Sequence, residues 1–214
     1  MPETTIADIW EHTSSSVNTS VILPDGCRDL IVEVTDNSRL DCFVTDLFDT
    51  PFHTRSCVNS HMVGFRFKAG TTVDVVRLLN AVQKAETTSK TEIVALIEEF
   101  TSLSANLNDA LISFKNAGQS VSAVAAGLGV ELRSLQRLVY KQTGRSPVYW
   151  RQLARVRNAG RMLTESNELA DVASLAGFSD QAHMTREFRR WFGVTPKVFL
   201  QNRSYKDQLG AIAY

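Results

Sequence analysis

The sequence predicts an α+β protein, with a β-rich N-terminal domain that carries helices at its end and an all-α C-terminal domain. Three observations predict this division. The spacing of apolar residues changes near residue 72, the second half repeats itself after 48 to 49 residues, and charge is divided unequally between the halves. The 214 residues, 43% of them hydrophobic, are enough for two small buried cores.

Residues 17–70 have the pattern of β-strands. In VILPDGCRDLIVEV a Pro-Asp-Gly turn separates two apolar runs, and Leu30, Val32 and Val34 alternate with polar residues. LDCFVTDLF and HMVGFRF have the same character, and the latter run ends at Lys68-Ala69-Gly70. These segments predict several strands joined by short turns.

From about residue 72 the apolar residues recur every three or four positions, which predicts amphipathic helices at 72–84 and 91–100. Ser89 or Thr91 is the expected N-cap of the latter. Their apolar faces can pack internally or against a second copy, so monomer and homodimer both stay open. A further helix, LNDALISFKNAG, is expected to end at Gly118.

The polar stretch TSLSANLN, residues 101–108, is the expected boundary between the domains. The predicted domains are 1–104, a β-rich sensor or interaction domain with helices at its end, and 105–203, a helical domain. Residues 204–214 are expected to form a C-terminal tail. Neither domain contains an apolar run long enough to span a membrane, and the N-terminus has no signal-peptide pattern.

The C-terminal region contains an internal repeat, in which residues 124–147 resemble residues 172–196. Each copy has the parts of a helix-turn-helix: a Val-Ala pair in a first helix, a turn glycine, an apolar plug, and a second helix that ends at glycine. A Ser-Pro or Thr-Pro pair then starts another helix. The paired parts are Val124-Ala125 and Val172-Ala173, Gly129 and Gly177, Val130 and Phe178, Gly144 and Gly193, and Ser146-Pro147 and Thr195-Pro196.

The formal net charge of zero hides two opposite halves. Residues 1–110 contain 8 basic and 16 acidic side chains, whereas residues 111–214 contain 15 and 7, so the halves carry −8 and +8. A basic helical half is typical of a protein that binds a polyanion. The second helix of each copy offers polar side chains opposite its core face, and Arg and Gln at this spacing suit a DNA major groove. Seven further cations are expected to contact phosphates, namely Arg145, Arg151, Arg155, Arg157, Arg189, Arg190 and Lys197.

Residues 148–163 separate the two copies and are predicted to form one continuous helix. Sixteen residues at 1.5 Å each span roughly 24 Å. This length suits two helices that enter successive major-groove segments, which lie about 34 Å apart on one face of the duplex.

Residues 106–203 closely resemble the AraC-type double helix-turn-helix domain, most clearly in Arg155, Arg157 and DVASLAGFSDQAHMTREFRRWFGVTP. The resemblance implies a bacterial transcription regulator, an activator or a repressor, that binds double-stranded DNA and has possible partners in a small-molecule effector and RNA polymerase. It implies that bases are contacted by Arg133, Gln136, Arg137, Ala182, His183, Thr185 and Arg186. A cytoplasmic location is expected because the three cysteines, Cys27, Cys42 and Cys57, are odd in number and scattered, which does not suggest a disulfide framework.

The first copy departs from the family pattern at two positions. Glu131 replaces the usual Ser or Thr, which removes a good N-cap, and Val139 replaces a usual Phe. The second copy keeps Phe188 and offers Ser179 as its expected cap. We therefore expect the first copy to be packed less firmly than the second, or to be less exacting in its reading of DNA.

The N-terminal half resembles the β-rich domain of a subset of AraC-type regulators. Pro24-Asp25-Gly26-Cys27, Asp29-Leu30, Gly64-Phe65-Arg66-Phe67 and Gly70 carry this resemblance, although Ala69 stands where those relatives usually have Pro. The resemblance implies a role in sensing a signal or in mediating contacts, and it assigns no ligand.

Three other hypotheses remain open. His53, Cys57 and His61 are spaced by four residues and suggest a metal site, and Cys27 beside Arg28 suggests a reactive thiol. The helical repeat also suits a protein-interaction module that does not bind DNA. An enzyme is not predicted, because Asp25 and Asp29 fit a turn better than an acid–base pair and no nucleophile, metalloprotease or phosphate-loop motif occurs. No cofactor is predicted.

Overall fold

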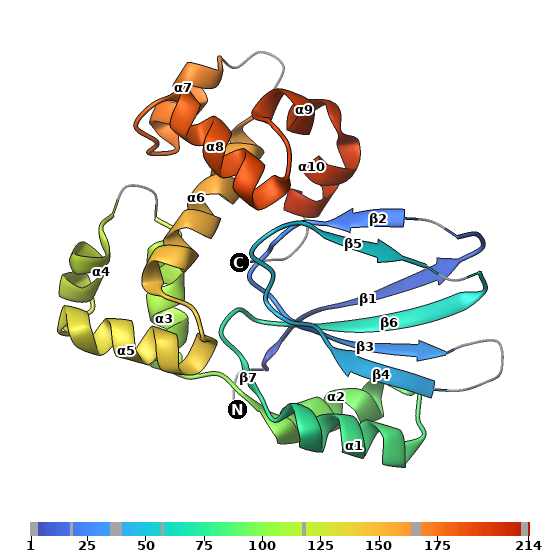
Figure 1. The fold of residues 1–214 in the computed structure, drawn as a ribbon. Coiled ribbons are helices and arrows are strands. Elements are labelled where there is room, and N and C mark those ends of the chain that lie inside the picture. Colours follow the sequence, from blue (N-terminus) through green and yellow to red (C-terminus); the bar gives the residue numbers. More distant parts are fainter. Residues whose placement is uncertain are drawn as a thin grey trace. The chain divides into compact units, whose positions relative to one another are not determined.

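The computed structural model describes residues 4–17, 19–34, 40–56, 58–116, 119–163, 168–210 and 214 (Figure 1). Contacts divide the chain into two compact units. The first comprises residues 1–21, 27–47 and 53–104, and the second comprises 22–26, 48–52 and 105–214. Strands dominate the first unit and helices the second, so the predicted α+β class is confirmed.

The first unit is built on an antiparallel sheet with the strand order β1-β6-β3-β4. These strands are β1 (Ile6–Ser14), β6 (Ser60–Phe67), β3 (Asp29–Val34) and β4 (Leu40–Val44). In the register, Val32 of β3 pairs with Val63 of β6 on one side and with Cys42 of β4 on the other. The sequence pattern missed β1, because this edge strand has few buried side chains and its apolar residues do not alternate.

Two helices, α1 (Val75–Ala85) and α2 (Lys90–Phe100), form the core of the first unit together with this sheet (Figure 1). Leu78 and Val82 of α1 and Ile93 and Ile97 of α2 are buried among apolar side chains of β3, β4 and β6. The apolar faces predicted on these helices therefore pack internally. Ser89 is the N-cap of α2, but its side chain makes no capping hydrogen bond.

The Pro-Asp-Gly segment does not close a hairpin. The strand before it, β2 (Thr19–Ile22), pairs with β5 (Phe52–Arg55) in a separate two-stranded sheet, whereas β3 after it belongs to the four-stranded sheet. The remaining pair of strands, β7 (Thr72–Val73) and β8 (Thr101–Ser102), brackets α1 and α2 along the chain.

Residues 22–26 pack within the second unit. The Arg157 Nη1 donates a hydrogen bond of 3.1 Å to the Pro24 carbonyl, and the Tyr214 amide donates one of 2.9 Å to the Asp25 carbonyl. These bonds hold the segment to residues that are far away along the chain, which explains why it does not form a local turn.

The second unit is helical. Its helices are α3 (Ala105–Phe114), α4 (Val121–Gly127), α5 (Leu132–Thr143), α6 (Pro147–Met162), α7 (Leu169–Leu175), α8 (Gln181–Phe192), α9 (Pro196–Gln201) and α10 (Arg203–Gly210). The stretch expected to be a tail thus contains α10, in which Tyr205 and Leu209 are buried. Gly118, the expected end of the helix before the first repeat, lies outside the described residues. Within the described part of the chain, no helix has both the length and the apolar character needed to cross a membrane.

Candidate nucleic-acid interface

Both repeats fold as helix-turn-helix units, α4–α5 and α7–α8, which lie at the two ends of α6 (Figure 1). The turn glycines, Gly129 and Gly177, adopt positive φ angles of 67° and 77°, a backbone conformation that glycine adopts without steric cost. The Val-Ala pair of each first helix is buried. These local features are the ones that the repeat predicts.

The helix α5 separates a core face from a polar face. Leu135 and Val139 are buried, whereas Arg133, Gln136 and Arg137 are exposed. The predicted base-contacting residues of the first copy therefore lie together on one accessible face, with cationic and amide groups free to meet the edges of bases.

The helix α8 has the same division, with Met184 and Phe188 buried and Ala182 and Arg186 exposed. Thr185 is half-buried, and its hydroxyl donates a hydrogen bond of 2.9 Å to the Gln181 carbonyl one turn earlier. Of the predicted base-contacting residues on α8, the exposed ones are thus one arginine and one alanine, whereas α5 exposes two arginines and a glutamine.

The sequence predicts Ser179 as the N-cap of α8, and this prediction is wrong, because the N-cap is Asp180. The Asp180 carboxylate accepts a hydrogen bond of 2.6 Å from the His183 amide, which lowers the pKa of Asp180 below its usual value. The Ser179 hydroxyl instead lies 3.0 Å from the Nδ1 atom of His183. Ser179 and Asp180 are equally good capping residues by type, and their order along the chain alone does not decide between them.

The first copy lacks this cap, as predicted, because Glu131 makes no capping hydrogen bond to α5. Its apolar plug also differs from the prediction. Val130 is 44% exposed, whereas the equivalent Phe178 is 6% exposed. The smaller side chain does not fill the angle between the helices that the phenyl ring fills in the second copy.

A single continuous helix, α6, connects the copies, as predicted. The Ser146 hydroxyl caps it by accepting from the Tyr149 amide, and Pro147 occupies its first turn. Thr195 and Pro196 start α9 in the same way. Both second helices end at a glycine in the left-handed conformation, Gly144 or Gly193.

Arg157 was expected to contact phosphate, and this prediction is wrong. The side chain is fully buried and donates hydrogen bonds to the carbonyls of Pro24 and Gln208, so DNA has no access to it. The pattern of α6 gave no sign of this role, because the partners lie 133 and 51 residues away in the sequence.

Arg145 is engaged by a segment of the N-terminal half. Its guanidinium lies 2.8 Å from the Asp49 carboxylate and over the ring of Tyr149, whose hydroxyl donates to the Phe48 carbonyl. A phosphate would have to compete with Asp49 for this cation.

The other predicted phosphate contacts keep accessible side chains. Arg151 and Arg155 are half-buried on α6, and burial together with the charge of Arg155 lowers the pKa of Arg151. Arg190 lies over the ring of Trp191 and donates to the Gln152 side chain. Arg189 and Lys197 are exposed. An anion placed beside Arg151 and Arg155 relieves the repulsion between two neighbouring cations.

Two of the N-terminal motifs, Asp29-Leu30 and Gly64-Phe65-Arg66-Phe67, meet on the four-stranded sheet. Arg66 and Asp29 form a largely buried ion pair with 3.0 Å between Nε and Oδ1, and Phe65 and Phe67, the sequence neighbours of Arg66, lie in the core. The structure therefore gives Asp29 a structural partner. Cys27 and Cys42 are buried cysteines, and burial raises the pKa of Cys42. Burial does not favour a reactive thiol at Cys27.

The metal hypothesis finds no support in the part that the structure describes. Cys57, the central member of the proposed set, lies outside the described residues. His53 is exposed on β5, and His61 on β6 lies 3.0 Å from the Thr13 hydroxyl. Among the described residues, no three His, Cys, Asp or Glu side chains cluster in a way that would hold a metal ion.

Known proteins that resemble this chain match its C-terminal half. Residues 124–202 match the family described as "Helix-turn-helix domain". The HTH-type transcriptional regulator RipA of Corynebacterium glutamicum is 42% identical over 71 residues, which cover 33% of this chain and 22% of RipA. The HTH-type transcriptional activator RhaS of Klebsiella pneumoniae is 34% identical over 113 residues, 51% of this chain and 41% of RhaS.

A solved AraC-type transcriptional regulator from Chromobacterium violaceum has a TM-score of 0.43 and 25% identity, with 45% of this chain and 89% of that chain covered. The chain spans less than half the length of RipA and of RhaS. The matched segment begins within α4 and continues through the rest of both helix-turn-helix units and α6. Residues 124–202 match the helix-turn-helix domain family.

Proposed function

We propose that the protein is a transcription regulator that binds double-stranded DNA at specific sequences and contacts two successive segments of the major groove. One observation carries this proposal. The helices α5 and α8 present equivalent exposed faces, and the single helix α6 connects the units to which they belong. If these surfaces were merely solvated and bound no ligand, the repetition of the same basic face on two helices would have no explanation.

The exposed faces of α5 and α8 would contribute differently to the recognition of bases. Arg133 and Arg137 can each form two hydrogen bonds to a guanine, and Gln136 can form two to an adenine. On α8, Arg186 is the strongest candidate for a base contact, and Ala182 suits the methyl group of a thymine. His183 and Thr185 reach bases only if their local hydrogen bonds allow it. We therefore assign more of the sequence discrimination to the first copy.

The affinity common to all sequences would come from Arg151, Arg155, Arg189, Arg190 and Lys197, together with Arg145 once it exchanges Asp49 for a phosphate. We further propose that the acidic N-terminal half senses a signal or mediates contacts, with an effector, RNA polymerase or a second copy of the chain as partner. The protein would act in the cytoplasm as a regulator and not as an enzyme.

The test is a salt series of duplex binding by the full chain, on a sequence selected from a random pool and on a scrambled one. With five phosphate contacts, a fourfold rise in salt weakens binding ~500-fold. Arg137→Ala and Arg186→Ala should each reduce the preference for the selected sequence, by about tenfold or more. Arg203→Ala is the matched control, because Arg203 lies on α10 with a 94% exposed side chain.

The proposal fails if the full chain binds neither duplex at low salt. It also fails if binding is insensitive to salt and both arginine variants match Arg203→Ala, the behaviour that a protein-interaction module predicts.

A further inference from the structure

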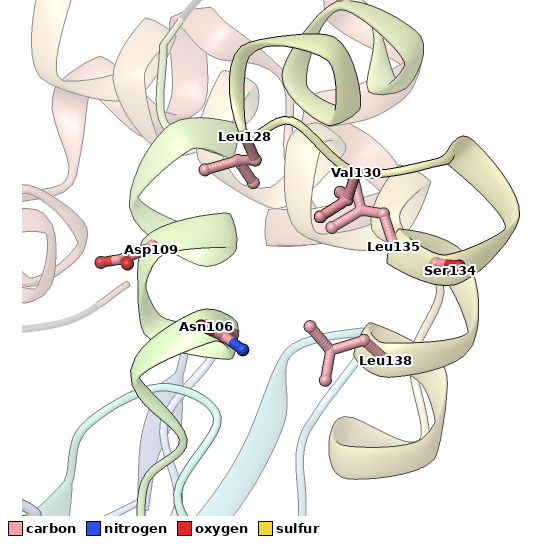
Figure 2. A pocket seen from close by; sticks show the side chains of 7 residues that line it. All are labelled: Asn106, Asp109, Leu128, Val130, Ser134, Leu135 and Leu138. Carbon is pink, nitrogen blue, oxygen red and sulfur yellow. The ribbon is translucent and has the colours of Figure 1, made fainter.

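A groove of about 330 Å³ lies in the first helix-turn-helix unit, between α3 and α5 (Figure 2). Figure 2 shows Asn106 and Leu138 facing each other across it, while the Asp109 carboxylate is directed away from α5. Four of the seven lining residues are apolar. The lining consists of Asn106, Asp109, Leu128, Val130, Ser134, Leu135 and Leu138.

The second copy of the repeat shows what fills the equivalent place. There the phenyl ring of Phe178 lies between the helix that precedes the unit, α6, and the second helix, α8. Its ring makes an edge contact with His183 at 5.3 Å and lies 5.5 Å below the Arg155 guanidinium. Through the 49-residue offset, His183 is equivalent to Ser134 in the wall of the groove.

In the first copy the ring is missing. Val130 stands where Phe178 stands in the second copy, and it is 44% exposed while Phe178 is 6% exposed. The groove is nevertheless bounded in the same way, with one wall from the preceding helix and one from the second helix. The groove therefore lies where the second copy has the ring of Phe178.

We propose that this groove binds a small, uncharged aromatic molecule whose ring takes the place that Phe178 takes in the second copy. The apolar side chains of Leu128, Leu135 and Leu138 would contact the ring. The Asn106 amide and the Ser134 hydroxyl would bond a hydroxyl or amide group on the molecule. Each of these two groups can donate and accept a hydrogen bond, so together they would orient the bound molecule without requiring it to carry a charge.

The groove adjoins the predicted DNA-contacting face. Leu135 and Leu138 line the groove, whereas Arg133, Gln136 and Arg137 lie on the polar face of the same helix, α5. The α5 helix lacks a side-chain cap. A bound molecule that bridges α3 and α5 would add contacts at the less firmly packed of the two units.

The experiment titrates 4-methylphenol into the full chain and follows backbone amide signals by nuclear magnetic resonance. We expect a dissociation constant on the order of 1 mM or tighter, from a ring of this size in a preformed groove. The shifts should concentrate at Asn106, Val130, Ser134 and Leu138. The double variant Asn106→Ala/Ser134→Ala, at two exposed positions, should weaken 4-methylphenol several-fold and leave toluene unchanged.

Val130→Phe supplies the ring from within the chain and should abolish binding of 4-methylphenol. Val198→Phe is its control, because Val198 is a valine of similar exposure, 48%, on α9. It should bind the probe as the wild type does. A melting curve of each variant shows that it is folded.

Two results overturn the site: no localised shifts in the wild type at saturating probe, or unchanged binding in folded Val130→Phe. A chain that binds the probe but no duplex would support this site and contradict the proposed function, so the two failures are distinguishable.

Discussion

Arg157 and Pro24 are joined by a buried hydrogen bond across 133 residues of sequence. The fully buried guanidinium on α6 donates to the Pro24 carbonyl at 3.1 Å and to the Gln208 carbonyl at 3.4 Å. A cation at the centre of the linker helix thereby fastens the Pro-Asp-Gly segment and α10 to the helix-turn-helix domain.

Arg157→Leu should lower the free energy of unfolding by about 2–4 kcal/mol, because it leaves buried carbonyls without their donor. Urea unfolding of the full chain measures this loss. The exposed Arg203→Ala should stay within about 0.5 kcal/mol of the wild type. An Arg157→Leu protein as stable as Arg203→Ala would show that the bond to Pro24 contributes little.

Gly26 is the second point of attachment of the same segment. A Cβ at this position would lie 2.7 Å from the Tyr214 Cβ and 2.9 Å from the Trp150 ring, and the φ angle is 77°. Gly26→Ala should therefore destabilise the protein by about 1–3 kcal/mol.

The control is Gly127→Ala in α4, where a Cβ would have no atom within 4 Å. It should leave stability unchanged or raise it by up to about 1 kcal/mol. Melting temperatures compare the two variants. Equal effects of the two substitutions would contradict the close packing described for Gly26.

The cap of α8 predicts a pH dependence. The His183 amide lowers the pKa of Asp180 in the folded state, with smaller contributions from Ser179 and Arg186. A carboxyl group with a lowered folded pKa stabilises the protein above its unfolded value and loses this effect as the pH falls through the folded value.

Asp180→Asn keeps a capping oxygen but does not titrate. The variant and the wild type should have similar stability near neutral pH. Below a pH of about 4, the wild type should lose more stability than the variant. Chemical unfolding at both pH values measures the difference. An identical pH dependence in both proteins would contradict the assigned cap.

Local signals were enough to predict the helix-turn-helix units. The turn glycines, the Ser-Pro and Thr-Pro starts and the division of α5 and α8 into faces depend on neighbours within a few residues, and the structure confirms them. The spacing of apolar residues also predicted α1 and α2, because each buries one regularly spaced row of apolar side chains. The helix α6 was predicted because its sequence continues without a proline beyond its first residue.

Long-range contacts account for what the sequence pattern missed. The sequence does not distinguish Arg157 from the other arginines of α6, because its buried role depends on hydrogen bonds to the distant Pro24 and Gln208 carbonyls. The strand β1 is recognisable only through its pairing with β6.

The most direct test of the account is a hydroxyl-radical footprint of the full chain on a duplex selected from a random pool. Two protected segments should appear on one face of the duplex, about 10 base pairs apart. Arg137→Ala should weaken protection mainly in one segment and Arg186→Ala mainly in the other. A single protected segment, or equal loss of both segments in each variant, would contradict the claim that α5 and α8 bind successive major-groove segments.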